Sequence, residues 1–575
     1  MLYEMATGSP AFQGGIAAVI FDAILHRTPV SPLRLRPELP PELERIIGKA
    51  LEKGRERRYQ SAREMLVDLR KLKRDTDSGA AAALRSRPAR RRALVAAAVA
   101  TVSAGGALWL ARRGKPLDSL AVLPFVNPGA DPNLEYLGEG IAESLINSLS
   151  QVPTLRVIAR TTAFRYKGPN VDPQKVGRDL GVRAVLTGSM VKRGDTLSVQ
   201  AGLIDVERGT QLWGQRYSRT SADIFSIQEE LAREISEKLR LTLTGEQKQR
   251  LTKRYTESAD AYEYYVRGRY HWNRRSRESI ERAIEYFGKA IDKDPGYALA
   301  YAGQADSYIL LPYFAQVPPM EAAQKAKAAA EKALAIDESL AEAHTSLAFF
   351  LHRADRDWAG AGREFRRALQ LNPGYATAHH WYANYLAGLG RFDEALEETR
   401  RAREADPLSL PINGAWARIL HMARRYDEAL EIYRKSIEME PDFAPARTWN
   451  GAAFLAKGDH PRAIAELESA LKVSGQDAFT AGLLAHALAR AGRRGEALRV
   501  VDGLRERSKR EYVTPYGIAL AYVGLGEKDQ AFAWLDRACE EYTAWLFFAK
   551  VEPLLDPLRP APRFKEVLRK LGLTP

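Results

Sequence analysis

Few residues in this chain of 575 have the types and spacing that chemistry requires. His379 and His380 are adjacent and suggest a metal-binding pair, but neighbouring residues on a helix point about 100° apart, so a shared metal is not expected. Cys539 is the single cysteine, so an intrachain disulfide is ruled out. A lone cysteine is most often a small buried apolar residue. We therefore expect no metal, no cofactor and no catalytic residue.

The elements around these residues follow a repeated pattern. The segments "AGREFRRALQLNP" (361–373), "ALEETRRAREADP" (395–407) and "ALEIYRKSIEMEP" (429–441) share a small residue, a bulky residue four positions later and a closing proline. The small residue returns every 34 positions, at Ala361, Ala395, Ala429, Ala463, Ala497 and Ala531, with earlier copies at Ala326 and Ala283. Small residues let antiparallel helices approach, bulky residues fill the space between hairpins, and proline ends the second helix.

This spacing resembles the tetratricopeptide repeat, with about eight copies over residues 258–545 and a capping helix over 546–575. The resemblance implies a superhelix whose concave wall is formed by the first helix of each pair, and a protein or peptide ligand in that groove. Candidate peptide contacts at the family's groove positions are Thr377, His380, Asn384, Arg418, His421, His486 and Arg490. The alternative is that these residues form a solvated polar face.

Residues 117–245 alternate between short apolar strands and amphipathic helices, which predicts an α/β domain. The stretch "LEYLGEGIAESLINSLSQVPTLRVIARTTAFRYKG" resembles a TolB amino-terminal-like domain. The resemblance carries no catalytic signature, so it implies a structural or interaction role.

Residues 1–74 resemble the end of the large lobe of a bacterial serine/threonine protein kinase. The matching positions include Tyr3, Glu4, Gly8, Phe12, Pro41, Leu43, Ile46, Ile47, Lys49, Ala50, Leu51, Lys53, Arg58, Tyr59 and Ser61. In the family, the arginine at the position of Arg58 forms a buried ion pair, so we expect an unpaired buried charge here.

The groups that phosphoryl transfer requires are missing from the sequence. It has no Gly-rich phosphate loop, no H-R-D catalytic loop and no D-F-G aspartate; "GEG" (138–140) lacks the third glycine and "HRAD" (352–355) belongs to a repeat. We expect no kinase activity from the chain as encoded. Two explanations stay open: Met1 is an internal residue of a longer kinase, or a truncation has left a degenerate remnant.

Residues 75–92, rich in Ala and Arg, are predicted to be a linker, and residues 93–111 form an uncharged run of 19. That length suits a transmembrane helix, and the five preceding and three following basic residues favour a cytoplasmic N-terminus. We therefore expect a single-pass protein of the cytoplasmic membrane with extracytoplasmic C-terminal domains. A peripheral apolar segment with cytoplasmic repeats is the alternative.

Net charge argues against a nucleic-acid partner. Residues 1–115 contain 22 Lys and Arg against 11 Asp and Glu, whereas the other 460 residues contain 64 against 61. The C-terminal part therefore has no basic excess of the kind that nucleic-acid binding needs. The expected fold is mostly α, a solenoid preceded by the α/β domain. The expected function is a protein-binding or sensor module, the non-catalytic part of a receptor kinase, with an envelope assembly or transport scaffold as the alternative.

Overall fold

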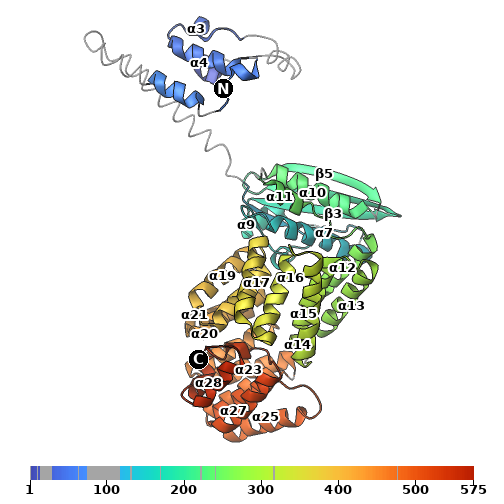
Figure 1. Cartoon of the computed structure of the whole chain (residues 1–575), viewed down its shortest axis with the longest axis vertical. Coiled ribbons are helices and arrows are strands. Elements are labelled where there is room, and N and C mark those ends of the chain that lie inside the picture. Colours follow the sequence, from blue (N-terminus) through green and yellow to red (C-terminus); the bar gives the residue numbers. More distant parts are fainter. Residues whose placement is uncertain are drawn as a thin grey trace, which may run out of the picture. The chain divides into compact units, whose positions relative to one another are not determined.

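The computed structural model describes residues 2–8, 11–12, 29–52, 54–61, 64–73 and 117–574, with short gaps at 130–131, 169, 221–222, 240, 242, 315–316 and 476. The chain divides into two compact units, Met1–Lys115 and Pro116–Pro575. Figure 1 shows the sheet and the helices of the second unit coloured along the sequence.

The first unit is a small set of helices: α1 (Leu2–Thr7), α3 (Pro32–Leu35), α4 (Pro41–Leu51), the 3-10 turn η1 (Arg55–Arg57) and a helix over 64–73. Its core contains Tyr3, Ile46 and Ile47. The side chain of Arg58 is exposed to solvent. The expected buried, unpaired charge is therefore wrong, because water hydrates this guanidinium and no burial penalty arises.

The predicted membrane helix over 93–111 and the linker over 75–92 lie outside the described residues. Within the described ranges, no helix combines the length and the apolar character that a membrane crossing requires. The predicted single-pass membrane protein is therefore not supported by the described part of the chain.

The second unit begins with a five-stranded sheet of order β2-β1-β3-β4-β5. Its strands are β1 (Ser119–Val122), β2 (Arg156–Val157), β3 (Ala184–Arg193), β4 (Thr196–Asp205) and β5 (Thr210–Thr220). β1 is parallel to β2 and β3, and β3, β4 and β5 form an antiparallel meander. The helices of this part are α7 (Pro132–Ser150), α8 (Arg160–Ala163), α9 (Pro173–Asp179), α10 (Ile224–Lys238) and α11 (Gly245–Leu251).

The remainder is a solenoid of helix pairs, which confirms the predicted mostly helical architecture. The first helix of each pair is α12 (Ala259–Trp272), α14 (Ala298–Phe314), α16 (Ala341–Phe350), α18 (Ala376–Gly388), α20 (Leu410–Met422), α22 (Ala444–Lys457), α24 (Ala478–Arg490) or α26 (Pro515–Leu525). The second is α13 (Arg277–Lys293), α15 (Pro319–Ile336), α17 (Trp358–Leu371), α19 (Phe392–Ala405), α21 (Tyr426–Met439), α23 (His460–Ser474), α25 (Arg494–Arg507) or α27 (Lys528–Glu540). A π-helical turn, η3 (Leu351–Asp355), extends α16.

The 34-residue period reflects packing inside each pair. The alanines at the repeated position, from Ala361 to Ala531, are completely buried. The turn between the two helices also repeats, because residues 356, 390, 424, 458, 492 and 526 all have positive φ. Glycine adopts this left-handed conformation without strain, and it occupies four of the six positions.

The sheet and the first repeats share one core. Leu145 of α7, Ile227 of α10, Val266 of α12 and Phe287 of α13 belong to the same buried cluster. Gly140 of α7 permits this approach, since a Cβ there would lie 2.3 Å from Val266 Cγ1. The α/β part is therefore fixed against the solenoid rather than tethered to it.

A second contact fixes the α/β part to later repeats. Ala159 N donates to Ala405 O at 2.7 Å, and Thr162 Oγ1 donates to Asp406 Oδ1 at 2.7 Å. These bonds join segments that lie about 245 residues apart in the sequence. Together with the shared core, these bonds hold the α/β part against both the first and the middle repeats.

The chain ends with η4 (Leu546–Phe548), η5 (Pro553–Leu558) and α28 (Pro562–Lys570). α28 is tied to α27, since Arg563 and Lys570 pair with Asp536 at 2.8 and 2.7 Å. Residues 541–558, called here the C-terminal segment, reach further than a cap on the last repeat. Their contacts define the candidate site.

Candidate functional site

The candidate groove residues occupy the first helices of their pairs. Thr377, His380 and Asn384 lie on α18, Arg418 and His421 on α20, and His486 and Arg490 on α24. Asn384, Arg418 and His486 occupy equivalent repeat positions, 34 and 68 residues apart. The structure joins two of them directly, because Arg418 Nη2 donates to Asn384 Oδ1 at 3.0 Å.

These residues differ widely in exposure. Asn384, Arg418, His421 and His486 are buried, Thr377 and His380 are half-buried, and Arg490 is exposed. Burial in the middle of the wall has an identifiable cause. The chain's own C-terminal segment packs against these inner helices.

Aromatic side chains of the C-terminal segment fill the space between the inner helices. The Trp545 ring lies 5.6 Å from Tyr313 of α14, 5.3 Å from Trp449 of α22 and 6.4 Å from Phe479 of α24, measured between centroids. Phe547 lies against Gly388 at the end of α18. With Arg418 of α20, which faces Trp545, one short peptide thus contacts the first helices of five repeats: α14, α18, α20, α22 and α24.

Three arginines hold these aromatic side chains, and we call them the arginine clasp: Arg353, Arg356 and Arg418. The guanidinium carbon of Arg353 lies 3.9 Å from the centroid of Phe547, and that of Arg418 lies 4.6 Å from Trp545. Arg356 faces Tyr542 at 4.7 Å. Cation–π contacts of this kind strengthen when they are shielded from water.

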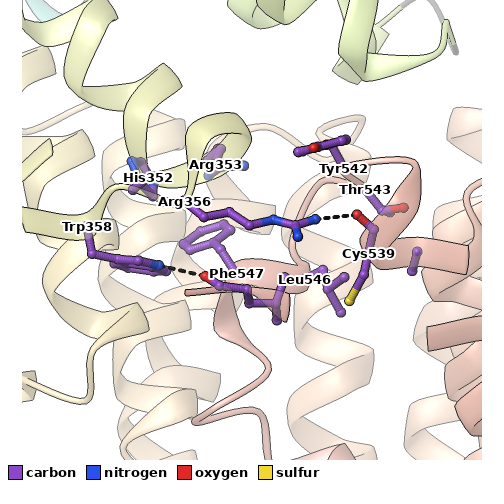
Figure 2. Close-up of a pocket in the computed structure, with 11 residues that line it drawn as sticks. His352, Arg353, Arg356, Trp358, Cys539, Tyr542, Thr543, Leu546 and Phe547 are labelled. Carbon is purple, nitrogen blue, oxygen red and sulfur yellow. Dashed lines mark hydrogen bonds between the residues drawn. The ribbon is translucent and has the colours of Figure 1, made fainter. Parts of the chain in front are cut away.

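Polar contacts also tie the segment, and the residues on either side of it, to the repeats. Arg424 Nη2 donates to Asp556 Oδ1 at 2.9 Å, and His421 Nε2 lies 3.7 Å from Glu552 Oε1. Figure 2 shows two further bonds, from Arg356 Nη2 to Cys539 O and from Trp358 Nε1 to Leu571 O, the second at 2.8 Å. The third repeat is therefore joined to residues about 180 to 210 positions later.

A small cavity separates η3 from the end of α27. Figure 2 shows His352, Arg353 and Arg356 on one side and Cys539, Tyr542 and Thr543 on the other. Burial, together with the charge of Arg353, lowers the pKa of His352 to about 3. Burial raises the pKa of Cys539 to about 11. At neutral pH the imidazole is uncharged and the thiol is protonated, so neither is poised for acid–base or nucleophilic chemistry.

The electrostatics of the wall are dominated by arginine. Burial lowers the pKa of His380 to about 3, and the charges of Arg418, Arg275 and Arg353 add to this effect. Burial also lowers the pKa of Arg418 to about 10. His380 is consequently neutral and can only exchange hydrogen bonds with a ligand.

His379 has a separate, structural role. Its Nδ1 lies 2.5 Å from Glu398 Oε2 of α19, and its Nε2 lies 2.9 Å from Pro373 O. Both ring nitrogens are thus engaged by protein groups, and neither is directed toward His380.

The comparisons with known proteins identify two parts of this unit. A tetratricopeptide repeat family model matches residues 352–418 and 420–487. Residues 116–237 match the model for the second domain of HilA/YgeH-like transcriptional regulators, so the resemblance to TolB is not confirmed. The repeats are those of a protein–protein interaction module.

Two curated relatives cover short parts of the chain. A Rhizobium meliloti protein named as a candidate adenylate cyclase (adenylate cyclase 3) is 40% identical over 184 residues, which are 32% of this chain and 31% of the relative. The serine/threonine-protein kinase PknB of Mycolicibacterium smegmatis is 39% identical over 69 residues, 12% of this chain and 11% of the kinase. The chain therefore spans less than a third of either relative.

Solved structures with similar folds are repeat proteins. Pseudomonas aeruginosa PilF is 20% identical, with a TM-score of 0.30, over 38% of this chain and 96% of that chain. YrrB, described as a repeat protein with an unusual peptide-binding site, is 25% identical, with a TM-score of 0.23, over 32% of this chain and 90% of that chain. The assignment of tetratricopeptide repeats rests on the family model, over residues 352–418 and 420–487.

Sequence reasoning missed the C-terminal segment and two members of the clasp, Arg353 and Arg356. The segment "TAWLFFAKVEPLLDPL" (543–558) was expected to end the last repeat and begin a cap. The sequence feature that marks this segment is a cluster of aromatic residues without helical periodicity, next to an acidic residue and two prolines. Such a cluster indicates burial but does not indicate against which helices.

Proposed function

We propose that residues 258–575 bind a partner protein within a bacterial regulatory protein, as the non-catalytic part of a serine/threonine protein kinase. The observation that carries the proposal is the clasp itself. A wall that holds residues 541–558 through arginine–aromatic contacts and a bond from Arg424 to the Asp556 carboxylate has the chemistry to hold a peptide.

The regulatory context rests on the relatives. The kinase match supports a kinase origin for the first unit, and the matches to an adenylate cyclase-named protein and a transcriptional-regulator domain are also regulatory in name. The part played by this chain is binding, because phosphoryl transfer needs groups that lie outside these matched segments.

The partner's contacts lie where the wall remains accessible. Thr377 and His380 on α18 are half-buried and Arg490 on α24 is exposed, whereas Asn384, Arg418, His421 and His486 are buried. We assign the first three to an external ligand. The buried four orient the wall and its C-terminal segment.

Site-specific photo-crosslinking in cells tests this assignment. A photoreactive amino acid replaces His380 in one variant and Arg363, an exposed residue of α17, in the control. We expect a discrete protein adduct at position 380 that competes with excess unlabelled chain, and none at 363. Identical adduct patterns at both positions would contradict the proposal.

A further inference from the structure

A second cavity lies where the α/β part meets the repeats, and we call it the junction cleft. Its volume is about 80 Å³. Helices α7 and α10 and residues 251–256 line one side, and α12, α14 and α16 line the other. Since one water position takes about 10–15 Å³, the cleft has room for a ligand of roughly six heavy atoms.

The charged groups at its rim are already paired. Arg254 Nη2 lies 3.3 Å from Glu229 Oε2, and Lys253 Nζ lies 2.7 Å from Asp337 Oδ2. The remaining charged residue of the lining is Glu342, in the first turn of α16. Among the described residues, no cation lies within ion-pair distance of its carboxylate.

Burial raises the pKa of the Glu342 carboxyl. A backbone hydrogen bond and the charge of Arg269 oppose this rise, and the charges of Asp306 and Asp337 add to it to a smaller extent. The charge of Glu342 in turn raises the pKa values of Tyr255 and Tyr265, after burial. A cation beside the Glu342 carboxylate would favour its charged form against the cost of burial, whereas an anion would disfavour it.

Two phenol groups at the floor of the cleft have no partner. Tyr265 and Tyr297 are 8% and 1% exposed, and in the described part of the chain neither hydroxyl has a hydrogen-bond partner. The hydroxyl of Tyr262, by contrast, is engaged by Ser144 and Gln228. Neither oxygen is among the sealed, unpartnered side-chain atoms of the described residues, so both open into the cleft, beside the carboxylate, and can accept from a ligand with hydrogen-bond donors.

We propose that the junction cleft binds a small aliphatic amine, protonated at neutral pH, whose ammonium group pairs with Glu342 and donates to the Tyr265 and Tyr297 hydroxyls. The ammonium group supplies three donors and one positive charge, which match one carboxylate and two phenol oxygens. The aliphatic part contacts Leu145, Leu251 and Leu299, which also line the cleft.

A helix N-terminus favours an acidic residue in any protein, and this accounts for the presence of Glu342 in the first turn of α16. It does not account for the two unused phenol groups. The two explanations give different results with small amines. If Glu342 only stabilises the helix, its removal changes thermal stability, and neither the wild type nor the variant binds small amines.

Isothermal titration calorimetry on the full chain distinguishes them. The probes are 1,4-diaminobutane and n-butylamine, with 1-butanol and butyrate as neutral and anionic analogues of similar size. We expect both amines to bind at least 10-fold more tightly than either analogue. Equal binding of butanol, or no detectable heat with either amine at millimolar concentration, would overturn the proposal.

Variants locate the binding. Glu342→Gln should weaken amine binding at least 10-fold and Tyr297→Phe a few-fold, while Glu338→Gln, which changes an exposed acid nearby, should leave it unchanged. Far-UV circular dichroism checks that each variant folds. If Glu342→Gln does not fold, Glu342→Asp keeps the charge on a shorter arm, and an unchanged affinity there would count against the site.

The inference goes beyond the proposed function and does not depend on it. Failure to crosslink a partner at position 380 leaves amine binding intact, and failure to bind amines leaves the partner site intact. Bound amine would also join α10 and α11 to α16. Hydrogen exchange of residues 251–256 should therefore slow in its presence, and unchanged exchange despite measurable heat would place the amine elsewhere.

Discussion

Arg418 on α20 contacts both the neighbouring inner helix α18 and the C-terminal segment. It donates to Asn384 on the preceding inner helix, and its guanidinium faces Trp545 of the C-terminal segment. It is 6% exposed, and no carboxylate pairs with it in the described part of the chain. Aromatic faces therefore provide the stabilisation that a counter-ion usually gives.

We expect Arg418→Ala to lower the free energy of unfolding by about 2–4 kcal/mol, because it removes a buried hydrogen bond and leaves a cavity under Trp545. Urea denaturation followed by tryptophan fluorescence measures this. Arg490→Ala, an exposed arginine on an equivalent inner helix, is the control, and its effect should stay within about 0.5 kcal/mol. Equal losses in both variants would remove Arg418 from the clasp.

Asp406 gives the chain a predictable response to pH. It is 4% exposed, and burial raises its pKa to about 6 despite the hydrogen bond from Thr162. The folded state thus keeps a proton that the unfolded state releases near pH 4. The stabilisation is complete below about pH 4 and is lost as the pH rises to about 6.

Stability should therefore fall by on the order of 2 kcal/mol from this group between pH 4 and pH 6. Asp406→Asn should remove that part of the slope when urea denaturation is repeated across the range. Asp442→Asn, at an exposed position, should leave the slope unchanged. A variant at 406 with the wild-type slope would show that this carboxyl titrates normally.

The 34-residue period was sufficient to find Asn384, Arg418 and His486, because equivalent positions of a repeat face the same way. Arg353 lies in the same register, two periods before His421, so the period could have marked it as an inner-helix position. What the period does not indicate is that this last turn of the third repeat's first helix is π-helical (η3).

In two of the turns between paired helices, arginine occupies the left-handed position that glycine occupies in other repeats. Arg356 and Arg424 have φ of 59° and 64°, at the position that Gly390 and Gly458 occupy in other repeats. A left-handed non-glycine residue costs about 1–2 kcal/mol. Both arginines reach the C-terminal segment, so contact with it offsets the backbone strain.

The two replacements by glycine should differ. Arg424→Gly relieves the strain and loses a half-exposed pair with Asp556 and a hydrogen bond with Tyr426, so the free energy of unfolding should change by less than about 0.5 kcal/mol. Arg356→Gly also loses the bond to Cys539 O and the contact with Tyr542, so it should destabilise by about 1–2 kcal/mol. Thermal unfolding of the two variants measures the difference, and a more stable Arg356→Gly would contradict the clasp.

The C-terminal segment is a permanent part of the groove rather than a displaceable peptide. Its buried residues include six large apolar side chains: Leu546, Phe547, Phe548, Leu554, Leu555 and Leu558. At about 1.5–3 kcal/mol for each, their burial contributes roughly 10 kcal/mol or more. A ligand that binds with micromolar affinity supplies about 8 kcal/mol, so it would not displace the segment.

The second unit behaves as one body, although the sequence suggested separate domains over 117–245 and 258–545. Repeat spacing and strand alternation are local patterns, and they correctly gave the solenoid and the sheet. The contacts that join the two parts, such as Ala159 with Ala405, link residues far apart and leave no periodic trace. The same holds for the path of residues 541–558 along the groove.

Gly140 tests the rigid junction. The sequence suggested only a degenerate glycine motif, whereas the structure places Gly140 of α7 against Val266 of α12. Gly140→Ala should destabilise by about 1–3 kcal/mol because the added methyl group forces the two helices apart. Calorimetry should show one transition for the wild type and separated transitions for the variant. Gly495→Ala, on the surface of α25 with open space around it, is the control.

Native-state hydrogen exchange of residues 541–558 tests the filled groove most directly. If the segment is an integral part of the solenoid, the amides of Phe548, Val551 and Leu555, which donate to backbone carbonyls of the segment, should exchange as slowly as those of α20 and α22. Arg418→Ala should then speed exchange in the segment and in α20 together. Exchange of the segment at the rate of an unfolded peptide, with α20 and α22 still protected, would contradict the account.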